Sequence, residues 1–302
     1  MNKPNESSAP VADRMRWFVV ATGALALGFS MPLYHLIRLA ADSDLYSYII
    51  LIPFISGYLV WTKRTTLPPP PAPAHSWTSS LLLVAAAGVL AVYWIILLSG
   101  TKLAPEDSLA LTTISLVLFF WGICGYFLGR ETVRALAFPL VFLVFMVPFP
   151  ICLRTSLETA LQYGSADAAH AFFTISGMPF LRDNVAFHLP GFSLQVAPEC
   201  SGIRSTLALF ITSLLAGHLY LRSPWKRAVL TVSVILIALL RNGFRVFVIG
   251  QLCVHIGPEM IDSPIHRHGG PVFFALSLIP FGVLLLWLVH LERRAVRPGE
   301  KK

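Results

Sequence analysis

The chain has 302 residues, of which 56% are hydrophobic and only 13% are charged. Soluble domains carry roughly a quarter charged residues, so this composition argues against a soluble protein and indicates an integral membrane protein. The formal net charge is +8, but no basic stripe interleaved with aromatic residues accompanies it, so we expect no nucleic-acid partner. The four cysteines lack C-x-x-C spacing, which argues against zinc ribbons and disulfide frameworks.

Eight apolar stretches predict membrane spans, because about 20 mostly apolar residues cross the hydrocarbon layer. In chain order they are 17–38, 46–62, 79–99, 108–128, 133–150, 203–221, 228–249 and 271–290. We therefore expect an all-α integral membrane protein with about eight transmembrane helices. The membrane domain at 17–292 would lie between a short N-terminal tail (1–16) and a basic C-terminal tail (293–302). A signal peptide is the alternative for residues 1–27, but their apolar run continues past the possible cleavage site at 24–26.

The segment 151–202 is too polar to cross the hydrocarbon as a whole, and we expect it on the outer side of the membrane. Its first half, Arg154 to Ile175, mixes small and apolar residues and predicts a helix in the membrane interface. Its second half alternates in character over 184–189 and 192–196, on either side of a Pro-Gly pair. This pattern predicts a small extended hairpin just before Cys200.

Basic residues flank the spans at several points that all lie on one side of the eight-span layout. They are Lys3, Arg14, Arg16, Lys63, Arg64, Arg130, Arg134, Arg222, Lys226, Arg227, Arg293, Arg294, Arg297, Lys301 and Lys302. By the positive-inside rule this side is the cytoplasm, so both termini are expected there. The chain is thus predicted to be a multi-pass protein of the cell (inner) membrane.

Three polar clusters return to the outer, periplasmic face in this layout, although they are far apart in the sequence. The first is Pro198–Arg204 at the start of the sixth span, and the second is Arg241–Arg245 near the outer end of the seventh. The third is His266–His268, in the loop before the eighth span. Their convergence at one leaflet predicts a polar functional site.

Cys200 has surroundings typical of a reactive thiol. Pro198 favours a helix start, so backbone N–H groups would face the thiolate, and Arg204 at i+4 would share its helical face. Both features favour the charged form of a thiol that Glu199 also flanks. The alternatives are a buried, inert Cys200 and an Arg204 that extends to the membrane interface.

Arg241 and Arg245 are one helical turn apart, with Asn242 between them. Ionisable residues at membrane depth are costly and usually face a protein interior or a watery cavity. An arginine in such a place could stabilise an oxyanion. The alternative is that both arginines reach outward to lipid headgroups.

His266 and His268 are the candidate general bases of the site. The alternative is a zinc site, in which His255, Glu259 and Asp262 would join them. We favour the general-base role over the zinc site, because a thiol nucleophile already explains why a histidine is present. We expect neither a metal nor a cofactor.

Several of these stretches resemble the exosortase/archaeosortase family. They are Val-Ala-Pro-Glu-Cys-Ser-Gly-Ile-Arg at 196–204, Arg-Asn-Gly-Phe-Arg-Val at 241–246, and His266 with Gly270 four residues later. The segments 44–53 and 179–184 are also similar to that family. The resemblance covers nearly the whole membrane region, and the cysteine motif is its most specific part.

The resemblance implies a multi-span cysteine transpeptidase with sortase-like chemistry on an unrelated fold. Matching the family residue by residue gives Cys200, Arg245 and His266 as the catalytic set, and the spacing to Gly270 selects His266 over His268. The implied partners are membrane-tethered proteins whose C-terminal signal combines a short motif (often Pro-Glu-Pro), a membrane helix and a basic tail. An acceptor, lipid or glycan, and the membrane lipids complete the expected partners. Supporting roles would then go to Glu199, Arg204, Arg241, Asn242 and His268.

Two other functions remain open at this point. The first is a non-catalytic membrane binder or transporter, whose arginines would hold an anionic lipid or glycan while Cys200 is incidental. The second is an intramembrane protease that only hydrolyses its substrate.

Overall fold

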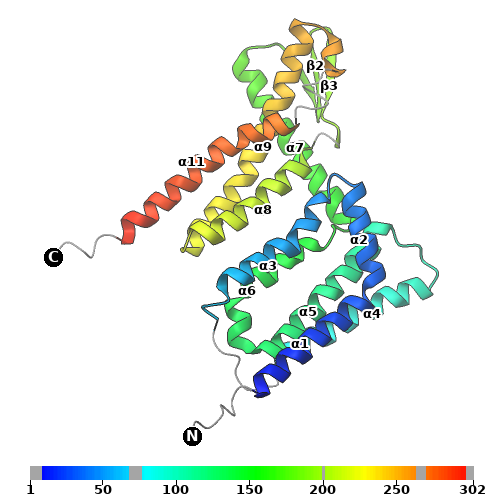
Figure 1. The fold of residues 1–302 in the computed structure, drawn as a ribbon. Coiled ribbons are helices and arrows are strands. Elements are labelled where there is room, and N and C mark those ends of the chain that lie inside the picture. The colour runs from blue at the N-terminus through cyan, green and yellow to red at the C-terminus, as the bar shows by residue number, and fades with distance from the viewer. Residues whose placement is uncertain (1–8, 68–76, 199–200, 263–269, 297–302) are drawn as a thin grey trace, which may run out of the picture. The chain divides into compact units, whose positions relative to one another are not determined.

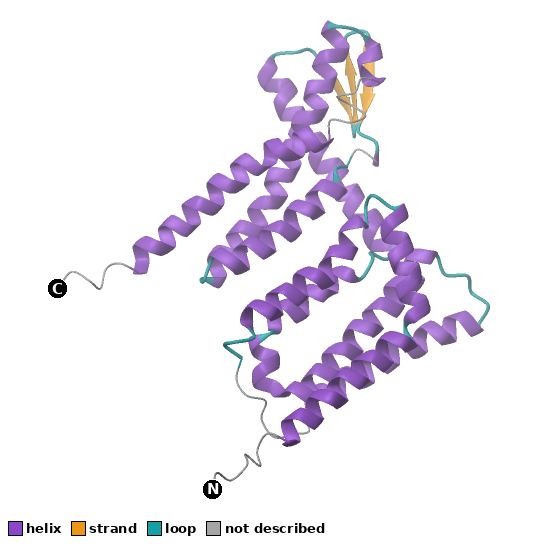
Figure 2. Cartoon of the chain, in the orientation of Figure 1, coloured by secondary structure: helices purple, strands orange, loops and turns teal. Residues whose placement is uncertain are grey.

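In the computed structural model, the structure describes residues 9–67, 77–198, 201–262 and 270–296 (Figure 1). Helices connected by loops and turns make up these residues, together with one small sheet (Figure 2). The elements are α1 (Ala9–Gly28), α2 (Ser30–Asp42), η1 (Ser47–Ile50), α3 (Leu51–Lys63), α4 (Trp77–Leu98), α5 (Pro105–Ala135), α6 (Ala137–Phe142), η2 (Leu143–Met146), α7 (Ile151–Ser176), β1 (Leu181–Asp183), β2 (Ala186–Leu189), β3 (Phe192–Gln195), α8 (Ile203–Tyr220), α9 (Pro224–His255), η4 (Pro258–Asp262) and α11 (Gly270–Val296). They form two compact units, which we call unit 1 (Met1–Leu153) and unit 2 (Arg154–Lys302).

Unit 1 is built around α5, against which α4 packs closely. A Cβ at Gly122 of α5 would lie 2.6 Å from a side-chain carbon of Leu83, so any larger residue at this crossing would require Leu83 to move. Seven residues earlier, the hydroxyl of Ser115 donates a hydrogen bond of 2.9 Å to the backbone oxygen of Ala86. Small residues and hydroxyl bonds of this kind are what hold helices together where lipid removes the hydrophobic driving force.

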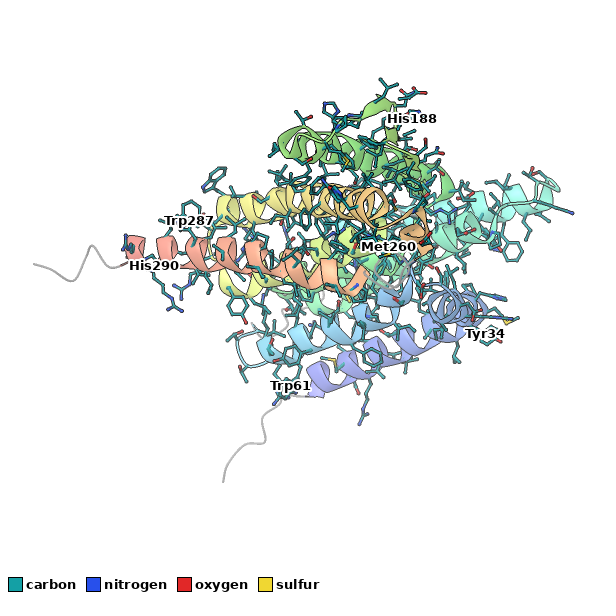
Figure 3. The ribbon with its side chains drawn as sticks, turned by 90° about the horizontal axis from the view of Figure 1, so that it is seen from above. Tyr34, Trp61, His188, Met260, Trp287 and His290 are labelled. Atoms are coloured by element: carbon teal, nitrogen blue, oxygen red, sulfur yellow. The ribbon has the colours of Figure 1, made fainter. Side chains whose placement is uncertain are left out.

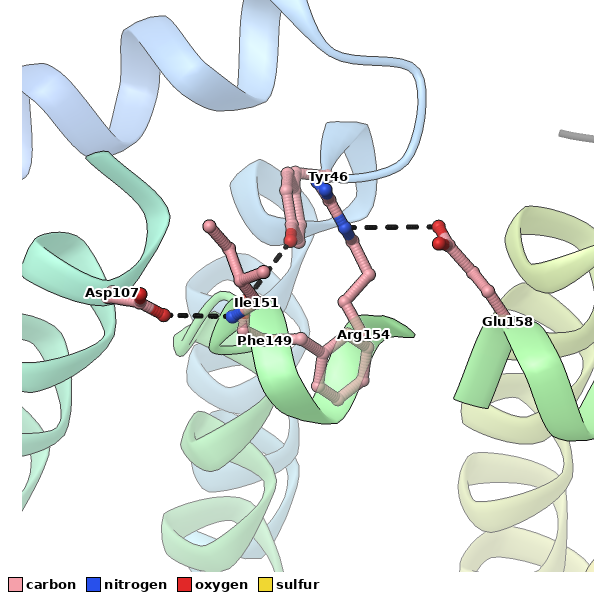
Figure 4. A network of polar contacts seen from close by, with 6 residues as sticks. All are labelled: Tyr46, Asp107, Phe149, Ile151, Arg154 and Glu158. Atoms are coloured by element: carbon pink, nitrogen blue, oxygen red, sulfur yellow. Dashed lines mark hydrogen bonds and ion pairs between the residues drawn. The ribbon is translucent and has the colours of Figure 1, made fainter. Parts of the chain in front are cut away.

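Polar contacts fix the turn region of unit 1 at the end of α2 and the start of α7. The side chain of Tyr46 is 1% exposed, and its hydroxyl donates to the backbone oxygen of Phe149 over 3.4 Å. The carboxylate of Asp107, in the first turn of α5, accepts the N–H of Ile151 at 2.8 Å. Figure 4 shows both contacts, together with the Arg154–Glu158 ion pair of 3.9 Å within α7. The N–H of the first residue of α7 is thereby satisfied by a side chain.

Unit 2 is built around α9, which α7, α8 and α11 contact. A Cβ at Gly243 would lie 2.5 Å from the Cβ of Ala168, so glycine allows the backbones of α9 and α7 to approach closely. On the α8 and α11 sides, buried apolar residues form a continuous core that includes Leu209, Val234 and Phe281. Close packing of these side chains stabilises the unit through van der Waals contacts, since lipid removes the hydrophobic driving force here too.

The three strands of unit 2 form an antiparallel sheet in the order β1-β2-β3. The sheet packs on α7 and α9 through a core that includes Phe173, Phe187, Val196 and Ile249. The 32 residues of α9 extend about 48 Å, well beyond a hydrocarbon core of roughly 30 Å. The end of α9 that carries the sheet therefore has length to extend past the apolar layer.

The all-α multi-span prediction is confirmed, whereas the count of eight spans is not. Among the described residues, five helices are long and apolar enough to cross a membrane, or up to seven if each of two bent pairs is one span. The first predicted span is bent by 68° between α1 and α2, and the second contains only the short α3. The stretch 133–150 gives α6 and η2, which end before Pro148, and proline disfavours helix at the preceding residue, here Val147.

The secondary structure predicted before Cys200 agrees with the structure, whereas the place of this segment in the outer membrane interface stays a prediction. The expected helix at 154–175 is part of α7, and the expected hairpin is β2 and β3, joined by a turn at Gly191 with φ +76°. The structure adds a third strand, β1, which pairs with β2 and which the alternation pattern did not indicate.

Candidate functional site

The cysteine motif approaches the arginine cluster at Gly202, the residue before α8. Gly202 has φ +76°, a left-handed conformation that glycine adopts without steric cost. A Cβ at this position would lie 3.0 Å from Nη2 of Arg241 and 3.1 Å from Oδ1 of Asn242. The backbone two residues after Cys200 therefore lies directly on the polar residues of α9.

The chain on the other side of Cys200 is held at Val196. Its backbone N–H donates to the backbone oxygen of Val185 at 3.0 Å, which extends the β2-β3 pairing. Its own backbone oxygen accepts a hydrogen bond of 2.5 Å from Nε2 of Gln162 on α7. Cys200 thus lies between two fixed points, Val196 and Gly202, which both belong to unit 2.

Arg241 is in the interior of unit 2, with only 7% of its surface exposed. Its Nη2 donates a 3.5 Å hydrogen bond to Oγ1 of Thr206, in the first turn of α8. Within the described residues, Nη1 of Arg241 and the hydroxyl of the buried Ser201 have no hydrogen-bond partner. Arg241 therefore does not extend to lipid headgroups, and it supports the start of α8 from within.

Asn242 joins α9 to α7 in the same interior. It is 2% exposed, and its Nδ2 donates to Oγ of the fully buried Ser165 at 2.9 Å. The sequence analysis missed both α7 residues of this region, Gln162 and Ser165. Gln162 and Ser165 are three residues apart on a helix with small neighbouring residues, and residues at this spacing share one helical face. This pattern could have predicted that the two side chains face the same partner.

Arg245 has a different environment from Arg241, although the two are one turn apart on α9. It is half-buried and lines a small pocket with Leu194, Val196 and Asn242. The end of the hairpin and the arginine therefore share one cleft. Of the two arginines, Arg245 is the one that lines this pocket, which is about 20 Å³ in volume and has room for one water molecule.

Four of the predicted site residues, Glu199, Cys200, His266 and His268, lie outside the described residues. The expected helix start at Pro198 corresponds to a 3₁₀ turn, closed by the N–H of Ser201 on the oxygen of Pro198, whereas α8 itself begins at Ile203. The left-handed Gly202 lies between this turn and α8, and the i, i+4 relation between Cys200 and Arg204 stays a prediction. Arg204 is exposed on α8.

The zinc alternative receives no support from the part of the chain that the structure describes. There, His, Cys, Asp and Glu side chains form no group of three that could hold a metal ion. His255 and Glu259 fall in this part, whereas the two loop histidines of the alternative do not.

A comparison with protein-family models matches residues 40–283 to a family described as transmembrane exosortase. The match spans most of the chain and includes every candidate site residue, from Glu199 to His268. No curated protein and no solved structure gives a significant match.

Proposed function

This chain belongs to the transmembrane exosortase family, and from that premise we propose that it is a membrane-embedded cysteine transpeptidase. Its substrates are secreted proteins with a C-terminal signal made of a short motif, a membrane helix and a basic tail. The enzyme cleaves the chain at this signal and transfers the new C-terminus to a lipid or glycan acceptor. The reaction takes place on the outer face of the inner membrane, with both termini of the enzyme in the cytoplasm.

One observation carries the proposal, namely the close approach of Gly202 to Arg241 and Asn242. It brings the backbone next to Cys200 to the polar part of α9, on which Arg245 lies one turn further along. A thiol with a nearby guanidinium is more readily ionised, and the thiolate is the nucleophile. The hydrogen bond from Gln162 to Val196 supports the proposal because it fixes the chain on the other side of the cysteine.

In the proposed first step, the Sγ of Cys200 attacks the scissile carbonyl carbon and forms a tetrahedral oxyanion. Arg245 stabilises the oxyanion, the C–N bond breaks, and His266 protonates the departing amine. The product is a thioester between Cys200 and the substrate. An acceptor nucleophile then attacks the thioester carbonyl, loses its proton to His266 and releases the thiolate.

The bilayer contributes to catalysis in this scheme. A substrate held by its own membrane helix presents one peptide bond at a fixed depth, which replaces a search in three dimensions by a search in the plane. The buried network of Asn242 and Ser165 keeps the α9 side of the site rigid. When the substrate and the site are positioned in this way, a small set of residues is enough for catalysis.

The test is processing of a tethered substrate by purified enzyme in vesicles, comparing wild type with Cys200→Ala. We expect Cys200→Ala to remain folded and to lose processing, whereas Cys152→Ala, at an exposed cysteine of α7 that forms no disulfide, retains it. Processing by Cys200→Ala at the wild-type rate would refute the nucleophile. A product ending in a free carboxylate in the presence of acceptor would indicate hydrolysis, and failure of Cys200 to react with thiol probes near neutral pH would favour a non-catalytic binder.

A further inference from the structure

Unit 1 contains an apolar cavity of about 680 Å³. This volume falls within the range of roughly 300–1,000 Å³ that small-molecule sites occupy. Residues of α1, α3, α5 and α6 line it, among them Phe18, Val60, Phe120 and Leu140. The catalytic scheme uses none of these residues, so the cavity requires a separate explanation.

The depth of the cavity equals that of one membrane leaflet. Along α3 it reaches from Pro53 to Arg64, which corresponds to about 16 Å of helix. One leaflet contributes about half of a hydrocarbon core of roughly 30 Å. The apolar lining is therefore as deep as a layer of acyl chains, with Arg64 at the level of the headgroups.

The end of the cavity at Arg64 is basic. The guanidinium carbon of Arg64 lies 4.5 Å from the ring centroid of Trp61, a residue labelled in Figure 3. Tryptophan is typical of the membrane interface, and cation–π contact holds the arginine there. The neighbouring Lys63 donates from Nζ to the backbone oxygen of Ala135 at 3.3 Å, so a second positive charge is fixed at the same end. This charge complements an anionic headgroup.

Two hydroxyl-bearing residues interrupt the apolar lining, Ser56 and Thr132, and each is 5% exposed. Within the described residues, neither hydroxyl has a hydrogen-bond partner, which is costly for a buried polar group. Thr132 belongs to the last turn of α5, near the basic end, where the ester oxygens of a phospholipid would lie. An ester oxygen would supply the acceptor that this hydroxyl lacks.

The basic end of the cavity favours a phospholipid over an apolar peptide helix as its occupant. A phospholipid brings an anionic headgroup to Arg64 and ester oxygens to the Thr132 hydroxyl, whereas an apolar helix brings neither, because its backbone acceptors are already bonded within the helix. We propose that unit 1 binds one anionic phospholipid, whose acyl chains enter the cavity and whose headgroup contacts Arg64. This binding is independent of the proposed transpeptidase reaction.

The test is lipid binding to the delipidated full-length protein in detergent, followed by native mass spectrometry. The probes are phosphatidylglycerol and phosphatidylcholine with identical acyl chains. Gly57→Phe fills the cavity, and Gly88→Phe, on an exposed face of α4, is the matched control. A Cβ at either glycine meets no described atom within 4 Å, so both variants are expected to fold, which thermal unfolding verifies.

We expect wild type and Gly88→Phe to bind phosphatidylglycerol equally well. Gly57→Phe should bind at least about tenfold more weakly, the loss expected when only two methylene groups leave an apolar cavity. Arg64→Gln should weaken phosphatidylglycerol binding about fivefold and leave phosphatidylcholine binding unchanged.

Equal binding of phosphatidylglycerol to Gly57→Phe and Gly88→Phe would overturn the proposal. So would equal affinity of wild type for the two phospholipids, because Arg64 would then not recognise the headgroup. If an added apolar helical peptide, or detergent alone, occupies the wild-type cavity and excludes the lipid, the proposed occupant is wrong. None of these measurements depends on peptide processing.

Discussion

Asn242 of α9 donates a hydrogen bond of 2.9 Å to the hydroxyl of Ser165 on α7, and both side chains are buried. The other polar end of Asn242 faces Gly202, the residue that connects the cysteine motif to α8. One amide therefore links the helix before the hairpin, the helix that carries the arginines and the chain next to Cys200. In the proposed enzyme, this link keeps the nucleophile and Arg245 in register.

Ser165→Ala is expected to lower the free energy of unfolding by about 1–3 kcal/mol, because it removes the acceptor of a buried donor. Processing should also fall, since Asn242 supports the loop before α8. Thr212→Ala is the control, because this exposed hydroxyl bonds only within its own helix, to Ala208. Thermal unfolding and the initial rate of processing are the measurements, and equal behaviour of the two variants would contradict the role of the network.

Gly202→Ala is expected to abolish most processing, because the new Cβ would press on Arg241 and Asn242 in addition to the strain of a positive φ. Gly100→Ala provides a matched control. Gly100 has φ +77°, nearly the same as Gly202, but a Cβ there meets no described atom within 4 Å. Each substitution carries the left-handed penalty of about 1–2 kcal/mol, so a difference in processing isolates the contact. Similar processing rates for the two variants would show that the contact of residue 202 with Arg241 and Asn242 does not contribute to processing.

Arg241 and Arg245 are expected to fail in different ways when each is replaced by lysine. Arg245→Lys should reduce kcat by about 10²–10³-fold, the usual effect of losing one oxyanion donor, with little change in stability. Arg241→Lys should lower the melting temperature, because Arg241 is buried and bonds to Thr206. Kinetics and thermal unfolding of both variants separate the roles. If Arg241→Lys instead reduces kcat and Arg245→Lys lowers the melting temperature, Arg241 would be the residue that stabilises the oxyanion.

Gln162→Ala removes the hydrogen bond to the backbone oxygen of Val196 and is expected to cost about 1 kcal/mol of stability. The larger effect should appear in kcat, because the chain before Cys200 loses one of the two hydrogen bonds that hold Val196 in place. Ser176→Ala serves as the control on the same helix, since its exposed hydroxyl bonds only to nearby backbone, donating to the oxygen of Phe173 and accepting from the N–H of Met178. Loss of stability without loss of kcat would limit Gln162 to a structural role.

The sequence predicted the α9 side of the site well. Two arginines and an asparagine within five residues of an apolar helix imply a polar interior, because lipid does not tolerate them. The structure places Arg241 and Asn242 in such an interior, and the hairpin before Cys200 follows from alternation around Pro190-Gly191. These features depend on local patterns of a few residues, which a single sequence contains.

The remaining features depend on tertiary contact, which local patterns do not contain. The left-handed Gly202 lies close against Arg241 and Asn242, and at this residue the turn that begins at Pro198 does not continue directly into α8. Gln162 and Ser165 acquire their roles only through the packing of α7 on α9. The bend between α1 and α2 likewise divides a stretch that is uniformly apolar in sequence.

The central claim is that Cys200 forms a thioester with the substrate. Wild-type enzyme incubated with a tethered substrate, without acceptor, should be quenched in acid and digested, and the peptide that contains Cys200 should be weighed by mass spectrometry. The account predicts that this peptide carries the substrate segment as an adduct that hydroxylamine removes, and that Arg245→Lys accumulates far less of it. Substrate cleavage without any adduct on Cys200, or with an adduct on another residue, would contradict it.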